Sequence, residues 1–220
     1  MHISEGVLSA PVLISGAALT AVGTTVGLKR LDYDRIAQVG ILSSAFFVAS
    51  LIHVNVGPSS VHLILNGIVG LLLGWSAVPA ILVALTLQAL FFQFGGITAL
   101  GVNTVVMALP AVICHYLFRP LLWRRPAVAM GAGFACGFLA VFLSALLLGG
   151  ALYFTEKAFL PVASLAVAAN LPVMVVEGLI TAFCIAFLKK VEPSLLPGRP
   201  PAPVNVEPST TVCEEIPHAS

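Results

Sequence analysis

The sequence predicts an all-α integral membrane protein, a compact bundle of about seven transmembrane helices. Of its 220 residues, 59% are hydrophobic and only 9% are charged. The mean hydropathy of +1.07 is too high for a water-soluble globular protein. Lys and Arg (10) almost balance Asp and Glu (9), so the charge gives no reason to expect a nucleic-acid partner. We expect the helices to be surrounded by membrane lipid.

Apolar runs bounded by Gly, Pro or charged residues mark the expected helices. In chain order they cover residues 9–28, 36–54, 60–76, 78–94, 101–118, 127–154 and 162–188. Only Ser76 and Ala77 separate the third run from the fourth. The pattern therefore also allows six or eight spans.

The chain changes character near residue 190. Residues 1–190 form the expected transmembrane domain, whereas residues 191–220 are rich in proline and poor in large apolar side chains. Such a composition cannot bury a core of its own. We expect residues 191–220 to be a disordered cytoplasmic tail.

Basic residues predict the orientation. With seven spans and the amino terminus outside, nine of the ten Lys and Arg residues fall in inner segments, and only Lys157 lies outside. Cytoplasmic loops of membrane proteins carry such an excess of Lys and Arg. The sequence therefore predicts a multi-pass protein of the cytoplasmic membrane, with its amino terminus outside and its carboxyl terminus in the cytoplasm.

The first residues, Met1 and His2, can form a metal chelate. The terminal amine, the backbone nitrogen of His2 and a ring nitrogen of His2 are three nitrogen donors near one plane, a geometry that Ni(II) and Cu(II) favour. We expect Met1 to remain in place, because residues 1–8 contain no Lys or Arg to begin a signal peptide and His2 is bulky. The alternative interpretation of His2 is a polar residue at a frayed terminus.

The chelate lacks a fourth ligand, and two histidines lie on the same side of the membrane. His53 and His62 flank residues 54–60, where Gly57-Pro58 predicts a turn and Ser59 or Ser60 a helix N-cap. His62 is then expected in the first turn of the third span. Either histidine could instead be an ordinary interfacial residue. His115 and His218 are expected at the inner side.

Four stretches resemble the CbiM/NikM family, the substrate-binding S components of energy-coupling-factor transporters for cobalt and nickel. The resemblance covers residues 1–190. It departs from the family at Phe94, where many members carry a polar residue. The matching stretches are Met1–Ser9, Gly57–Gly67, Phe91–Met107 and Glu177–Thr181.

The resemblance implies a specific metal site. The amino-terminal loop would fold into a pocket at the outer side, where the Met1 amine, the His2 backbone and ring nitrogens and the His62 ring hold the metal. His53 would not bind the metal itself but would contact one of the ligands and orient it. Asn66 and Asn103 would shape the pocket, although each could instead bond backbone inside its own helix.

Glu177 interrupts the last apolar run. A carboxylate in a span costs about 2.5–3.5 kcal/mol on insertion scales, so some interaction must offset it. The carboxyl group could be protonated, could bond the backbone of a facing helix, or could face the site or a partner subunit. We expect a structural or coupling role for Glu177 rather than ligation, and a kink at Asn170-Leu171-Pro172.

No phosphate-binding G-x-x-x-x-G-K-[ST] loop occurs in the sequence, so ATP hydrolysis would have to come from other subunits. The resemblance implies a transmembrane coupling (T) component, cytoplasmic ATPase subunits and often a small additional membrane subunit. The expected substrate is Ni(II) or Co(II), with nickel favoured by the planar nitrogen set, and no cofactor is expected. The alternatives are a membrane-embedded metalloenzyme, a metal chaperone or an ion channel. The proposed ligands leave no open coordination position for catalysis, and channels need weaker sites.

Overall fold

The computed structural model describes residues 2–56, 59–156, 161 and 167–198, and of residues 53–56 and 59–62 the backbone only. Met1, Lys157 and residues 199–220 of the expected tail lie outside the described residues. So do the side chains of His53 and His62. The first part of the expected tail is not disordered: a 3-10 helix covers Pro193–Leu195, and Leu196 is 2% exposed.

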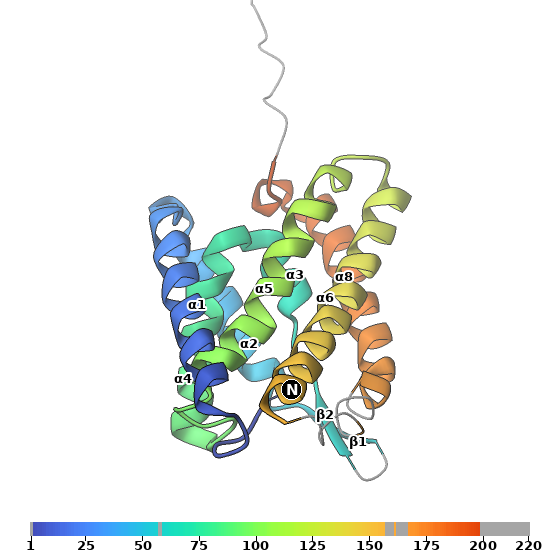
Figure 1. Cartoon of the computed structure of the whole chain (residues 1–220). Helices are drawn as coiled ribbons and strands as arrows, with labels where there is room; N and C mark the ends of the chain where they lie inside the picture. Colours follow the sequence, from blue (N-terminus) through green and yellow to red (C-terminus); the bar gives the residue numbers. More distant parts are fainter. Residues whose placement is uncertain (1, 57–58, 157–160, 162–166, 199–220) are drawn as a thin grey trace, which may run out of the picture.

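The described chain is a helical bundle with one short β-hairpin at its lower end (Figure 1). Five helical stretches among the described residues are long and apolar enough to cross a membrane, α3 and α4 counting together as one. This confirms the expected all-α, multi-pass fold. The helices are α1 (Ala10–Lys29), α2 (Ile36–Ala49), α3 (Asn66–Leu73), α4 (Ala77–Phe92), α5 (Leu100–Phe118), α6 (Pro126–Thr155) and α8 (Leu171–Val191); the strands are β1 (His53–Val56) and β2 (Ser59–His62).

The third expected span is partly wrong. Ser59 and Ser60 do not cap a helix, and His62 is not in a helical turn; all three belong to strand β2, and α3 begins only at Asn66. Alternating valines in β1 and Val61 in β2 favour paired strands over a helix end. The second span likewise ends at Ala49 instead of residue 54, because the chain turns into β1.

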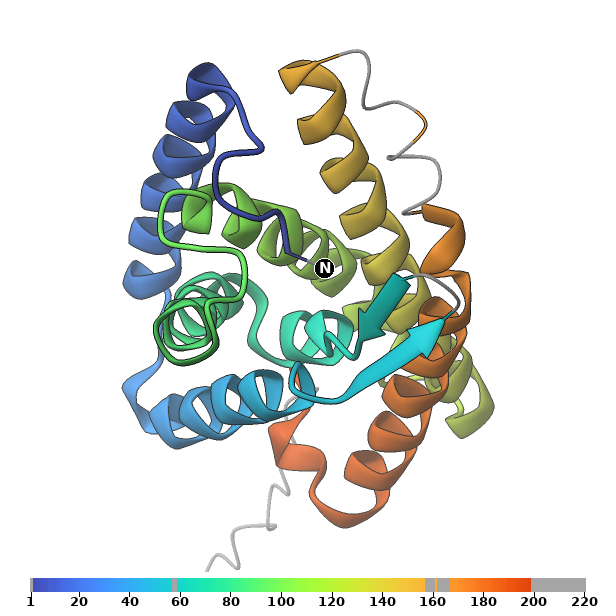
Figure 2. The same ribbon diagram turned by 90° about the horizontal axis from the view of Figure 1, so that it is seen from below.

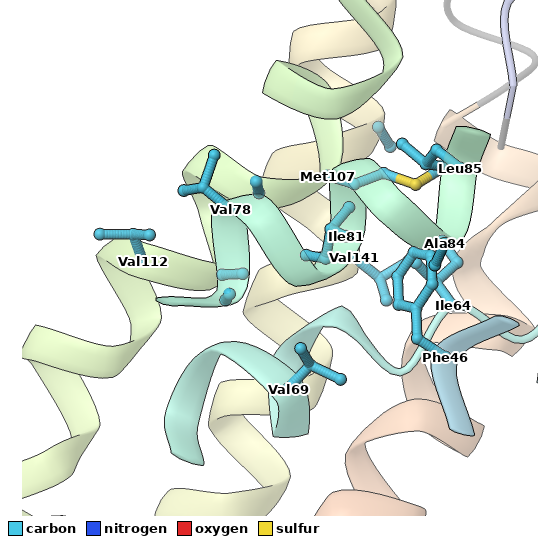
Figure 3. Packing of buried hydrophobic residues seen from close by; sticks show 14 of the residues in the cluster. Phe46, Ile64, Val69, Val78, Ile81, Ala84, Leu85, Met107, Val112 and Val141 are labelled. Atoms are coloured by element: carbon cyan, nitrogen blue, oxygen red, sulfur yellow. The ribbon is translucent and has the colours of Figure 1, made fainter. Parts of the chain in front are cut away.

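Helix α3 lies in the middle of the bundle. Every residue from Asn66 to Leu72 is buried, as expected of a helix that is apolar all round. Small residues let its neighbours approach: a Cβ atom on Gly70 would lie 2.4 Å from the carbonyl oxygen of Ala111 in α5, and one on Gly67 would lie 2.7 Å from Cα of Gly137 in α6. Figure 3 shows the core beside α3, where Phe46, Ile64 and Ala84 belong to one cluster.

The carboxyl-terminal ends of α1, α5 and α8 lie at the upper end of the bundle (Figure 1), and basic side chains there form hydrogen bonds between elements. Arg30 donates to the Tyr116 hydroxyl at 2.9 Å, and Arg35 donates to the carbonyl of Leu195 at 2.9 Å. Lys189 donates to the carbonyl of Leu122 at 2.7 Å. The hairpin and the amino-terminal loop lie at the opposite end.

Candidate metal site

The amino-terminal loop, residues 2–9, is packed into the lower end of the bundle (Figure 2). Ile3 is 4% exposed and belongs to a cluster with Val102 of α5 and Leu148 of α6. Burying such a side chain stabilises the position by about 1.5–3 kcal/mol. The loop therefore has an apolar anchor directly after His2.

Asn103 adds a polar anchor to the same residue. The backbone N–H of Ile3 donates to Oδ1 of Asn103 at 2.9 Å, and Nδ2 of Asn103 donates to the carbonyl of Ile3 at 3.1 Å. Asn103 is 2% exposed, so both bonds are shielded from water. The Asn103 side chain thus bonds the amino-terminal loop and not its own helix, whereas its part in shaping a metal pocket stays a prediction.

His2 is half-buried and packs against the bundle. Both of its ring nitrogens are inaccessible to solvent. Its ring stacks on Phe94, with the centroids 6.0 Å apart and the planes at 15°. Phe94 is the position where the sequence departs from the family pattern, and sequence reasoning assigned it no role. The aromatic contact restricts the His2 ring to one side of the pocket.

Residues Gln93–Ala99 form a loop that covers the amino-terminal loop. Gly95 has a φ of +77° and Gly96 a φ of +86°, a region that residues with a Cβ atom rarely adopt. A Cβ atom on Gly96 would lie 1.9 Å from Cγ of Glu5. The Glu5 carboxylate accepts the backbone N–H of Thr98 at 3.2 Å. The two loops thus interlock, and a cavity of about 300 Å³ lined by Ser4, Glu5, Gln93 and Gly95 opens beside them.

The hairpin brings the backbones of the two outer histidines together. Strands β1 and β2 are antiparallel, and their register pairs His53 with His62 and Asn55 with Ser60. The backbone N–H of Leu63 donates to the carbonyl of Ile52 at 3.4 Å, which continues the pairing. The imidazoles themselves lie outside the described atoms, so their part in a metal site stays a prediction.

Asn66 and Glu177 lie inward of the hairpin. Asn66 is 0% exposed, and its Nδ2 donates to the carbonyl of Met107 at 3.1 Å and to Oγ of Ser144 at 2.9 Å. Asn66 therefore joins α3 to α5 and α6, and does not bond its own helix. Glu177 is 0% exposed and accepts the backbone N–H groups of Ile64 and Leu65. Residues 167–169 are helical, Asn170 is in a turn, and α8 begins at Leu171 with Pro172 in its first turn. The interruption expected at Asn170-Leu171-Pro172 is therefore present, as a boundary between helical segments, because Pro suits a helix start.

His115 lies elsewhere, as expected. It is 12 residues after Asn103 in α5, about 18 Å further along the helix axis. Its Nδ1 is 2.8 Å from the carbonyl oxygen of Leu71. Within the described parts of the chain, no three His, Cys, Asp or Glu side chains gather closely enough to hold a metal ion. A site built from His2 would need donors from the backbone, from Met1 or from the hairpin.

Comparison with known proteins fits this arrangement. The family model described as "Cobalt uptake substrate-specific transmembrane region", CbiM, matches residues 2–195. The chain belongs to this family. It is therefore a component of a metal transporter and not an enzyme.

Relatives named as transport proteins support the assignment to the CbiM family. A putative metal transport protein of Haemophilus influenzae is 45% identical over 206 residues, covering 89% of this chain and 97% of that protein. A fused nickel transport protein, NikMN, of Rhodobacter capsulatus is 33% identical over 92% of this chain and 66% of its own length. The crystal structure of a transition metal transporter superposes with a TM-score of 0.72 at 25% identity, covering 87% of this chain and 93% of that chain.

Proposed function

We propose that this CbiM-family protein captures Ni(II) or Co(II) outside the cytoplasmic membrane as the substrate-specific component of an ATP-driven transporter. The proposed ligands are the Met1 amine, the backbone and ring nitrogens of His2 and the ring of His62. The observation that supports this most is the double hydrogen bond between Asn103 and the backbone of Ile3, which holds the residue after His2 inside the bundle. A terminus held in this way is pre-organised for chelation.

The donor set favours nickel over cobalt. Four nitrogen donors near one plane suit Ni(II), and nitrogen sites bind Co(II) somewhat less tightly in the usual affinity order. Copper would bind such donors more tightly still. Its exclusion would then depend on its availability outside the cell or on partner proteins.

Uptake would need subunits that this chain does not supply. Its 220 residues contain no G-x-x-x-x-G-K-[ST] loop. The energy of ATP would therefore come from cytoplasmic ATPase subunits that act through a transmembrane coupling component. A small accessory membrane subunit would be a further partner. The interlocked loops at the outer end fit a component that encloses its substrate before transfer.

The amine of Met1 provides the sharpest test. Two residues added before Met1 remove that amine from the chelate and shift His2 relative to the terminus, while every side chain stays. We expect the extended protein to insert normally but to lose nickel and cobalt, measured as metal per chain after purification, with intact mass confirming each terminus. The matched control carries the same two residues after Ser220 and should retain its metal. Unchanged metal content in the extended protein would overturn the ligand assignment of Met1.

A further inference from the structure

Helix α3 begins inside the bundle rather than at its surface. The chain enters through strand β2 and the non-helical residues Leu63–Leu65. Leu65 has a φ of +56°, the left-handed region that residues other than Gly rarely adopt. Such a conformation persists only where surrounding contacts enforce it. The segment that follows His62 is therefore held by something outside itself.

The carboxylate of Glu177 is that contact. Its Oε1 accepts the backbone N–H of Leu65 at 2.8 Å and also the N–H of Ile64. If the carboxylate were removed, these two backbone N–H groups, which lie where the span is interrupted, would lose their hydrogen-bond acceptor inside the protein. Both N–H groups lie at the amino-terminal end of α3, the positive end of its helix dipole.

Within the described residues, every hydrogen bond of this carboxylate goes to these two amides. Its other oxygen, Oε2, is buried and has no hydrogen-bond partner among them. A carboxylate placed only to join α8 to α6 would be expected to bond α6. The backbone of α8 already meets α6 directly at Gly137, where a Cβ atom would lie 2.5 Å from the Glu177 carbonyl oxygen.

We infer that Glu177 is a positioning residue for the metal site. Its carboxylate fixes the backbone two and three residues after His62 and so sets where strand β2 presents that histidine. This inference rests on the proposed function, since it takes His62 as a ligand. It also makes α8 the helix that is hydrogen-bonded to the segment following the ligand-bearing strand.

Two substitutions separate positioning from packing. Glu177→Met keeps a similar volume but removes the strong acceptor, so it empties no cavity. Glu177→Gln keeps one carbonyl oxygen as a neutral acceptor, and neutral bonds are about half as strong as charged ones. The matched control is Thr181→Val, because Thr181 lies one turn further along α8, is equally buried, and has a similar shape to Val.

The measurements are Ni(II) affinity and amide hydrogen exchange in the metal-free, full-length protein. We expect Glu177→Met to weaken Ni(II) binding by about 10–100-fold, the range for residues that orient ligands, and Glu177→Gln by less. Exchange in a peptide covering residues 63–66 should rise in the same order. Thr181→Val should match the parent protein in both measurements. A merely structural role would raise exchange across α6 and α8 as well.

The inference and the proposed function fail in different ways. Parent-like affinity and exchange in Glu177→Met, or equal losses in Thr181→Val, would overturn the inference while His62→Ala still loses its metal. Metal retained by His62→Ala would overturn the proposed ligands. The exchange measured without metal would still show whether Glu177 holds residues 63–66.

Discussion

Single side chains, each from a different helix, hold the candidate site at its edges. Asn103 of α5 holds Ile3, and Glu177 of α8 holds Ile64 and Leu65. In both cases a buried polar side chain bonds backbone next to a proposed ligand, and not the ligand itself. The loops that carry the ligands can then be irregular while their positions stay fixed.

Replacing Asn103 tests this at the amino terminus. Asn103→Leu removes both bonds to Ile3, each of which contributes about 0.5–1.5 kcal/mol. We expect the loop to loosen and Ni(II) affinity to fall by about 10–100-fold, measured by titration of the purified protein. Thr104→Val is the matched control, because the Thr104 hydroxyl bonds only its own helix, at the carbonyl of Leu100. An equal loss in both variants would contradict the role given to Asn103.

The histidines should rank clearly. His62→Ala should abolish metal retention, because it removes a ligand, and His53→Ala should weaken it by about 10–100-fold, as loss of an orienting residue does. His115→Ala should leave metal retention unchanged, because His115 lies far along α5 from Asn103 and its ring contacts the Leu71 carbonyl of α3. Metal per chain after purification measures all three. Equal effects at His53 and His62 would mean that the two roles are assigned wrongly.

At the scale of elements, the sequence predicts the continuous helices well and the interrupted one poorly. The fifth run, expected at 101–118, is α5 at Leu100–Phe118. Pro110 lies within it, and a transmembrane helix tolerates such a proline where its neighbours satisfy the freed backbone groups. The third run fails because the acceptor that stabilises its start, Glu177, lies 112 residues after Leu65. Local spacing carries no sign of that bond. The contact of Phe94 with His2 is hidden for the same reason, whereas the chelate proposed for Met1 and His2 can be predicted from the sequence itself.

The loop Gln93–Ala99 offers a test at this scale. Gly96→Ala would place a Cβ atom against Glu5 and strain a φ of +86°, so the two loops should separate. We expect lower metal affinity and greater proteolysis of the amino-terminal loop, with the membrane helices intact. Gly150→Ala is the control: it lies within α6, where a Cβ atom meets nothing within 4 Å. Unchanged affinity in Gly96→Ala would show that the loops need not interlock for binding.

At the scale of the molecule, the two ends differ in character. The amino-terminal loop, the hairpin and residues 93–99 occupy one end, and the basic residues occupy the other (Figure 1). Lys29 lies at the end of α1, Arg119 directly after α5, and Lys189 in the last turn of α8. Helices α1, α5 and α8 run in the same direction and so carry these basic residues to the same end. We therefore expect that end to be the cytoplasmic one, because cytoplasmic loops of membrane proteins carry an excess of Lys and Arg.

This orientation decides whether the site loads from outside, and reporter fusions measure it. Green fluorescent protein fused after Lys190 should fluoresce, because it folds in the cytoplasm, and alkaline phosphatase at the same position should be inactive. Alkaline phosphatase inserted at Lys157 should be active, because that segment is expected outside. Each reporter is active only on the side of the membrane where the other is inactive, so the two reporters serve as controls for each other. Inverting the protein would move the basic residues at the ends of α1, α5 and α8 across the membrane, so we expect no mixed population. The reverse pattern would place His2 at the cytoplasmic face, where it could not capture an external metal, and uptake through this end of the bundle would have to be abandoned.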